Sequence, residues 1–294
     1  MSVRPATHDD YDAVAAFTEN TWPDREGGDY IPRVYHDWID GDDRETFVYD
    51  TGDELAGICQ GVLLSPHEGW SQGMRVNPDY RGEGIGSRIV DRVLGWLREQ
   101  GATVCRNMVF SWNQAGLGQS RAVGFEPAGE FRWMTPAPDP TAESELAVRN
   151  APDAAWSCFA RSDACTALRG LALDLDESYA VAELTRERLH RVAAEERVFA
   201  VGDGAGTRAM SFRARTTEYG DGDVYAEYGV AAWADTEALR SLIAAVARDA
   251  ADQGADATRV LIPETVHHVS DAALARAGIA DEPDFLMEAD LTGR

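Results

Sequence analysis

The sequence predicts an α/β chain built as two tandem domains, each a layered α+β fold with a mixed, mostly antiparallel central sheet flanked by helices. Three observations support this prediction. A glycine-rich turn at 81–86 lies between a strand-like run and an amphipathic helix, the second half repeats landmarks of the first, and a proline-rich stretch separates the halves. The 294 residues suffice for two hydrophobic cores.

The first half alternates strand-like and helical runs in a definite order. Apolar residues recur every four positions from Ile85 to Leu97, which is the pattern of a helix with one buried face, and Gly101 ends it. Proline at position 66 ends the strand before the third one. We expect helices at 8–21, about 31–39 and about 87–100, and strands at 3–7, 46–49, 55–64, 70–76, 103–110 and 130–134.

The turn Arg81-Gly82-Glu83-Gly84-Ile85-Gly86 has the character of an anion site. Its glycines permit tight turns and close approach of a ligand, and the amides of the following helix point back at the turn. A nucleotide phosphate loop would need Gly-Lys-Ser/Thr, which is missing. A dinucleotide fingerprint would need a third glycine at the position of Ser87.

The spacing Arg81-x-x-Gly84-x-Gly86 resembles the Arg/Gln-x-x-Gly-x-Gly/Ala loop of the GCN5-related N-acetyltransferase (GNAT) superfamily. The segment from Asn113 to Gly124-Phe125 resembles a second motif of that family, so the resemblance covers residues 1 to about 135. It implies acetyl-CoA as co-substrate, with its pyrophosphate over the loop amides, its thioester carbonyl near the strand before the loop, and its pantetheine arm near Asn113. The implied cofactor-binding residues are Met74, Arg75, Val76, Arg81, Gly82, Glu83, Gly84, Ile85, Gly86, Ser87, Asn113 and Ser120.

The residues that would handle protons depart from the family pattern. Many relatives have Glu nine positions before the loop arginine, where this chain has Gln72, and a carboxamide is not a base. Glu68 or His67 acting through water is an alternative, although both could simply be solvated residues beside a proline. Many relatives have Tyr where this chain has Ser120, which could still bond the sulfur. A thiolate of pKa about 8.5 can also depart without an acid.

The resemblance also implies where the acceptor amine would bind, because the second helix and adjoining loops wall that site in the family. The candidate substrate residues are Trp22, Asp29, Tyr30 and Trp112. Aromatic residues at such positions can instead belong to the core.

The second half indicates an internal duplication. Phe199 follows Phe47 by 152 positions, and Val230 follows Val76 by 154. The counterpart of the glycine loop is Asp235 to Arg240, which lacks glycine and carries acidic residues. We therefore expect a catalytic, CoA-binding domain at 1–136, a linker at 137–143, and a degenerate domain at 144–294. Segments near Asp29, Gln72 and Leu184 loosely resemble the tandem group that includes histidine N-acetyltransferase.

Composition narrows the function further. The net charge is −24, and all 27 basic residues are arginine. Dispersed acidity favours adaptation to a high-salt cytoplasm, as in a halophile, over an acidic surface made for cationic partners. No basic stripe suggests nucleic-acid binding.

We expect no metal, because cysteine and histidine spacings match no ligand motif. No apolar stretch suggests a membrane span and the first residues, Met1 to Pro5, resemble no secretory h-region, so a cytoplasmic location is expected.

The sequence thus predicts an acetyl-CoA-dependent N-acetyltransferase that acts on a primary amine of a small molecule or amino acid, by direct transfer in a ternary complex. The losses at Gln72 and Ser120 leave a weakly catalytic CoA-binding regulatory protein as the alternative. A structural protein built of two inactive copies is a third reading, which the intact loop glycines disfavour. The acceptor and the oligomeric state stay open.

Overall fold

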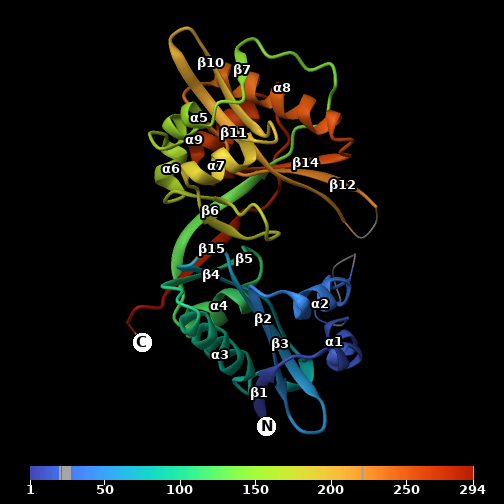
Figure 1. Ribbon diagram of the computed structural model, residues 1–294. Helices are drawn as coiled ribbons and strands as arrows, with labels where there is room; N and C mark the ends of the chain where they lie inside the picture. Colours follow the sequence, from blue (N-terminus) through green and yellow to red (C-terminus); the bar gives the residue numbers. More distant parts are fainter. Residues whose placement is uncertain (20, 22–27, 220–221, 294) are drawn as a thin grey trace. The chain divides into compact units, whose positions relative to one another are not determined.

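The structure is a computed structural model that describes residues 1–19, 21, 28–219 and 222–293 (Figure 1). The chain divides into two compact units. The first comprises Met1–Val109, Asn113–Pro127 and Met287–Arg294, and the second comprises Phe110–Trp112 and Ala128–Leu286. In the described parts of the chain, no helix is long and apolar enough to cross a membrane.

The first unit contains one sheet with helices on both faces. Its elements are β1 (Ser2–Pro5), η1 (His8–Asp10), α1 (Tyr11–Thr18), α2 (Ile31–Asp40), β2 (Arg44–Asp50), β3 (Leu55–Leu63), β4 (Glu68–Val76), η2 (Pro78–Tyr80), α3 (Ile85–Glu99), β5 (Val104–Phe110) and α4 (Gln114–Ala122). Strands β1 to β4 pair antiparallel in sequence order, and β5 joins β4 in parallel. Helices α1 and α2 cover one face and α3 the other (Figure 1).

The predicted stripe of α3 packs on glycines of the sheet. A Cβ atom added at Gly57 would lie 2.8 Å from Ile89, and one added at Gly69 would lie 2.8 Å from Leu97. The intervening Val93 lies over Gly61 in the same way, at 3.0 Å. The side chains of α3 therefore sit directly on the backbone of β3 and β4, which fixes the helix against the end of β4 that leads into the glycine loop.

The second unit repeats this strand order. Its elements are most of β6 (Glu126–Met134), β7 (Ala147–Arg149), α5 (Pro152–Phe159), α6 (Asp163–Ala167), β8 (Leu171–Leu173), β9 (Val181–Glu183), α7 (Arg186–Ala193), β10 (Val198–Asp203), β11 (Gly206–Glu218), β12 (Val224–Tyr228), β13 (Ala232–Trp233), α8 (Thr236–Asp252), β14 (Ala257–Pro263), α9 (Val266–Leu274) and the start of β15 (Asp284–Asp290).

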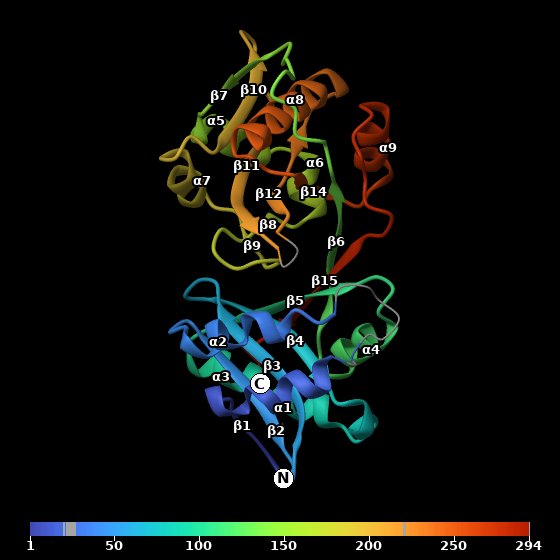
Figure 2. The same cartoon turned by 90° about the vertical axis from the view of Figure 1, so that its right-hand side faces the viewer.

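Strands β7, β10, β11 and β12 pair antiparallel, and β14 joins β12 in parallel, as β5 joins β4 in the first unit. Helix α8 packs on β10 and β11 (Figure 2), as α3 packs on β2 and β3. The predicted class, a layered α/β architecture with a mixed, mostly antiparallel sheet flanked by helices, is confirmed.

The last strand does not stay within the second half. Residues Met287, Ala289 and Leu291 are buried in the core under α3 of the first unit. Conversely, β6 follows α4 in the chain but pairs with β14 through Phe131–Met134 in the second unit. We expected residues 144–294 to form one domain, and the structure instead groups the final residues with the first unit, because they supply apolar side chains to its core.

The proline-rich stretch after β6 forms no helix or strand, as expected, but it belongs to the second unit. The Asp139 amide donates to the carbonyl of Ala247 on α8 at 2.9 Å. The Thr258 hydroxyl donates to the carbonyl of Pro136. One backbone bond and one side-chain bond therefore attach this stretch to α8 and β14, and it is not a free linker between the two units.

Candidate active site

The glycine loop ends at an uncapped helix N-terminus. Helix α3 begins at Ile85, two residues earlier than expected, and its N-cap is Gly84, with a left-handed φ of +75° and no side-chain cap. A Cβ atom at Gly84 or at Gly82, where φ is +86°, would meet nothing within 4 Å. The first helical bond runs from the amide of Arg88 to the carbonyl of Gly84. The amides of residues 85–87 precede it and can therefore receive an anion.

The other loop residues lie as an anion site requires. Arg81, Gly82, Glu83 and Gly84 are exposed, Ser87 is half-buried, and Ile85 and Gly86 are buried. The Arg81 side chain makes no ion pair or hydrogen bond with the described residues. A Cβ atom at Gly86 would lie 2.6 Å from Nε2 of Gln119, so a larger residue there would displace the end of that side chain.

Strands β4 and β5 pair over only part of their length. The parallel ladder joins Glu68–Trp70 to Val104–Arg106 and ends there, although β4 continues to Val76 and β5 to Phe110. On its other edge, β4 carries a bulge: Gly73 and Met74 together lie opposite Cys59, between the pairs Gln60–Gln72 and Ile58–Arg75. The bulge therefore lies beyond the end of the β4–β5 ladder. The residues implied to bind the thioester lie in the bulge (Met74) or directly after it (Arg75 and Val76).

Trp38 of α2 packs directly on this bulge. Gly73 has a φ of +67°, and a Cβ added there would lie 2.2 Å from Cη2 of Trp38. Only glycine satisfies both conditions. Met74 and Val76 turn to the opposite face and pack against the core under α3.

Gln72, beside the bulge, belongs to a directional chain of hydrogen bonds. The Trp70 indole donates to Oε1 of Gln72 at 3.1 Å, and Nε2 of Gln72 donates to Oε1 of Gln60 at 2.8 Å. Nε2 of Gln60 donates to the Trp38 carbonyl at 3.2 Å and to Oγ1 of Thr46 at 3.0 Å. The indole can only donate and the carbonyl can only accept, so both amides have a fixed orientation.

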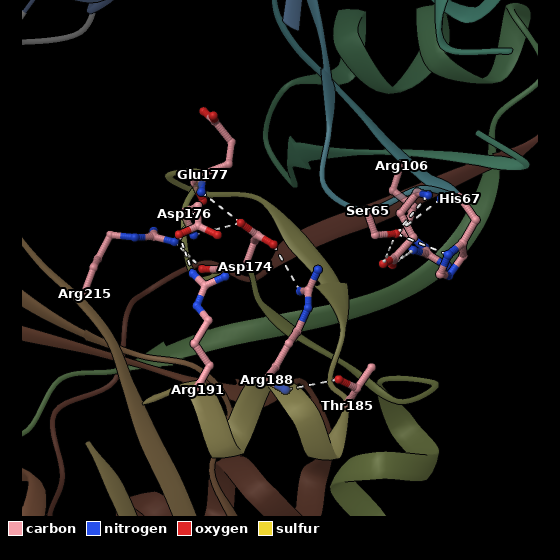
Figure 3. Close-up of polar contacts among 11 residues, drawn as sticks. Ser65, His67, Arg106, Asp174, Asp176, Glu177, Thr185, Arg188, Arg191 and Arg215 are labelled. Atoms are coloured by element: carbon pink, nitrogen blue, oxygen red, sulfur yellow. Dashed lines mark hydrogen bonds and ion pairs between the residues drawn. The ribbon is translucent and has the colours of Figure 1, made fainter. Parts of the chain in front are cut away.

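Glu68 lies at the other end of β4 and is fully engaged. Its carboxylate accepts from Nη1 of Arg106 at 2.7 Å and from Oγ of Ser65 at 3.0 Å, and its side chain is 2% exposed. His67 is exposed and contacts Ser65 through Nδ1 at 3.3 Å. Figure 3 shows Ser65, His67 and Arg106 gathered at this end of the strand. Glu68 lies six positions before Met74 along the strand, a span of about 20 Å.

Two of the candidate acceptor residues meet beside the bulge. Arg75 donates from Nε and Nη2 to the two oxygens of Asp29, at 2.6 and 3.3 Å. Tyr30 lies over the same guanidinium, with its ring centroid 5.5 Å from Cζ, and its ring meets Trp38 edge-on. Asp29, Tyr30, Arg75 and Trp38 therefore form a wall next to Gly73.

The other two candidate acceptor residues cannot be placed with this wall. Trp112 stacks on Phe110 at 5.3 Å and is grouped with the second unit. Trp22 lies outside the described residues.

Ser120 is buried on α4 and has a partner that sequence reasoning missed. Nδ2 of Asn107, on β5, donates to its hydroxyl oxygen at 3.2 Å. The Oδ1 atom of Asn107 and the Nε2 atom of Gln119 are buried without a hydrogen-bond partner among the described residues. A polar side chain within an apolar strand, as at Asn107 or Gln60, was the available signal for such residues.

Asn113 is the N-cap of α4. Its Oδ1 accepts from the amide of Gly116 at 3.0 Å, which fixes the side chain and leaves Nδ2 as the group that a pantetheine carbonyl could meet. This assignment to pantetheine stays a prediction.

Cys59, opposite the bulge, is a buried thiol rather than a nucleophile. Its Sγ lies 3.3 Å from the carbonyl oxygen of Gln72. Burial raises the pKa of Cys59 to about 11, so the thiolate is scarce near neutral pH.

Helix α8, the counterpart of α3 in the second unit, begins differently. Asp235 is the N-cap of α8, and its own carboxylate accepts from the amide of Ala238 at 2.9 Å. Arg208 pairs with both Asp235 and Glu237. Here the helix N-terminus is occupied by the protein's own carboxylate, whereas that of α3 is bare.

The comparisons with known proteins agree with this geometry. Residues 11–125 match the model of the Acetyltransferase (GNAT) family. A GCN5-related N-acetyltransferase from Sphaerobacter thermophilus superposes with a TM-score of 0.62 at 14% identity, over 98% of this chain and 95% of that one. A protein from Thermoplasma acidophilum, provisionally described as an acetyltransferase, gives 0.60 at 17% identity, over 99% and 100%.

A similarly described protein from Pyrococcus horikoshii gives 0.55 at 13% identity, over 98% and 88%. At these identities the likeness establishes the fold and not the substrate. The fold is therefore that of the GNAT acetyltransferases, and the matched residues contain the glycine loop and the bulged strand.

Proposed function

We propose that the first unit transfers the acetyl group of acetyl-CoA to a primary amine of a small molecule or amino acid. The observation that carries this proposal is the uncapped N-terminus of α3, where Gly84 has a left-handed φ and faces open space. The loop follows β4, which is no longer paired with β5 beyond Trp70. In this proposal the pyrophosphate lies on the amides of residues 82–87, supported by Arg81. The pantetheine arm enters beyond the β4–β5 ladder and meets Nδ2 of Asn113.

The acetyl carbonyl would then lie at the bulge, where amides of residues 74–76 stabilise the charge that develops on its oxygen. Direct attack by the amine in a ternary complex is favoured over an acyl-enzyme. Cys59 and Cys105 are buried, and burial raises the pKa of both thiols. Ser120 would bond the leaving sulfur. The second unit, whose α8 terminus is self-capped, would bind no CoA.

We also propose that the protein works in a cytoplasm of high salt, on the strength of its net charge of −24 and its lack of lysine. At molar salt the screening length falls to about 3 Å, which weakens repulsion between surface carboxylates. Unfolding midpoints should rise between about 0.1 M and molar KCl, and by more than they rise with sucrose at equal osmolality, because sucrose stabilises folded proteins without screening charge. Equal unfolding midpoints at both KCl concentrations would contradict this adaptation.

The activity is tested by incubating the protein with acetyl-CoA and a panel of amines in molar KCl and following the release of free thiol. The panel includes histidine, because three short segments resemble the histidine N-acetyltransferase group. Turnover with at least one amine is expected. Tight acetyl-CoA binding without turnover would favour a CoA-binding regulatory protein, and no binding would overturn the proposal.

A further inference from the structure

If the first unit is an acetyltransferase, as proposed above, each turnover releases the sulfur of CoA. The nitrogen lone pair of the amine forms the N–C bond, the C–S bond breaks, and sulfur takes the electron pair. The proton that the nitrogen loses passes to solvent or to the sulfur, which gives the thiol of CoA. Because negative charge develops on sulfur, hydrogen-bond donors beside it favour the transfer.

Asn107 is a polar side chain on an apolar face of β5. The ladder that joins β5 to β4 ends at Arg106, so Asn107 is the first residue beyond it. Side chains alternate along a strand, and Cys105 and Val109, two positions to either side, are buried in the core under α3. Asn107 therefore lies on the α3 face, whereas α1 and α2 cover the other face (Figure 1). It stands where the two strands begin to part.

Asn107 and Ser120 form a hydrogen-bonded pair with a defined direction. Nδ2 of Asn107 donates to Oγ of Ser120 at 3.2 Å. An amide nitrogen carries two hydrogens, and a hydroxyl has one hydrogen beside its acceptor lone pairs. Since the Ser120 oxygen accepts in this bond, its own hydrogen points elsewhere, and the second amide hydrogen takes no part in the bond. The pair therefore carries two donors close enough together to contact one sulfur atom.

The oxygen of the same amide supplies a second observation. Oδ1 of Asn107 is buried and has no hydrogen-bond partner within the part of the chain that the structure describes. A buried acceptor without a partner costs free energy, which a ligand can recover by donating to it. In CoA an amide N–H lies two carbon atoms before the sulfur. A primary amide, with an acceptor beside its donor, is complementary to this end of the cofactor.

The pair also lies next to the start of α3. Ser120 follows Gln119 on α4, and Nε2 of Gln119 would lie 2.6 Å from a Cβ atom added at Gly86. Gly86 belongs to the glycine loop where the pyrophosphate is proposed to bind. A cofactor that enters at this loop and runs between the parted strands would pass the pair.

We propose that Asn107 and Ser120 together bind the thiol end of CoA and stabilise its thiolate as it leaves. The second N–H of Asn107 and the hydroxyl of Ser120 donate to sulfur, and Oδ1 of Asn107 accepts from the cofactor amide. Hydrogen bonds to a charged sulfur are stronger than those to a neutral thioester, so the pair acts chiefly once the C–S bond breaks. Neither group gives up a proton, because both are poor acids at neutral pH.

The first test titrates the thiol of bound CoA. The ultraviolet absorbance of the thiolate is followed against pH with CoA saturating the full chain in molar KCl. Dethio-CoA, in which hydrogen replaces the thiol, provides the blank for the tyrosines. The pKa of the bound thiol should fall about one unit below that of free CoA, which is an about 10-fold shift toward thiolate. A bound pKa equal to or above that of free CoA would overturn the proposal.

Two variants assign the effect to the pair. Asn107→Leu and Ser120→Ala should each shift the thiol pKa back toward that of free CoA and lower kcat for acetyl transfer about 10-fold, while Ser120→Ala binds dethio-CoA as the natural chain does. Met108→Leu, on the other face of β5, is the control and should change neither quantity. If Asn107→Leu does not fold, Ser120→Ala decides the case.

The outcomes separate this inference from the function on which it rests. If acetyl transfer occurs and the bound thiol has the same pKa in the natural chain and in the variants, the pair is structural and only this inference is overturned. If neither CoA nor dethio-CoA binds, the proposed function is refuted and this inference with it.

Discussion

Asp29 and Arg75 lie 46 positions apart in the sequence, and the Arg75 guanidinium donates to both oxygens of the Asp29 carboxylate beside the bulge in β4. Both side chains are almost completely buried. This pair joins the segment before α2 to the strand that leads into the glycine loop.

Asp29→Asn should destabilise the first unit by about 3–5 kcal/mol, because it leaves the Arg75 charge buried without a counter-ion. Urea unfolding in molar KCl measures the change. Replacing both members together, Asp29→Leu with Arg75→Met, should recover much of the loss. Asp29→Asn with unchanged stability would show that the ion pair contributes little.

Gly84→Asp should abolish the binding of CoA measured by calorimetry, because the new carboxylate would lie at the N-terminus of α3, where the pyrophosphate is proposed to bind. Gly84→Asn is the matched control, since asparagine has nearly the same shape and also tolerates the left-handed region. The Asn variant should bind at least 10-fold more tightly than the Asp variant. Equal affinities for the two variants would place the anion elsewhere.

Asn113→Ala should cost about 1 kcal/mol of stability through loss of the N-cap of α4, and should also weaken CoA binding. Asn113→Ser keeps a capping oxygen but lacks Nδ2. If Nδ2 meets the pantetheine, the Ser variant should regain stability and not affinity. Recovery of both in the Ser variant would limit Asn113 to capping.

Leu291→Ala should destabilise the first unit by about 2–5 kcal/mol, although residue 291 follows the whole second half of the chain. The side chain is 3% exposed within the core under α3. Leu274→Ala on α9, at a side chain 60% exposed, is the control and should change little. Thermal unfolding that is equally insensitive to both changes would contradict the placement of the last strand.

Asp284 should make the second unit lose stability as the pH rises. Burial raises the pKa of this carboxyl from its usual 3.8 to about 6, although the Trp133 indole donates to it at 3.0 Å. Its contribution is fully present below pH 4 and is lost as the pH rises through 6. Asp284→Asn keeps an acceptor for Trp133 and removes this loss.

The Asn variant should therefore be more stable than the natural chain at pH 8, by at most about 3 kcal/mol, with the advantage vanishing near pH 4. Urea midpoints of the two proteins across this range provide the measurement. An advantage of the Asn variant that is the same at every pH would show that the carboxyl stays ionised throughout.

Local features of the sequence determined much of the first unit. The four-residue recurrence from Ile85 to Leu97 predicted α3, and the glycine spacing predicted the turn before it. Helix periodicity and turn chemistry depend on residues close together in the chain, so they can be recognised without knowing the fold. The same holds for Asp235 at the start of α8, whose carboxylate caps the helix only three residues away.

Tertiary structure alone decided the chemistry around the bulge. The bulge at Gly73 exists only relative to the register of β3, and the Gln72 amide is fixed by Gln60 only because those two residues lie opposite each other. Glu68 is paired with Arg106, which lies 38 positions later on another strand. Leu291, near the end of the chain, packs in the core of the first unit. The pairing of strands determines which side chains become buried neighbours. Helices and strands are predicted from residues close together in the sequence, and these residues do not indicate which distant segment will pair with them.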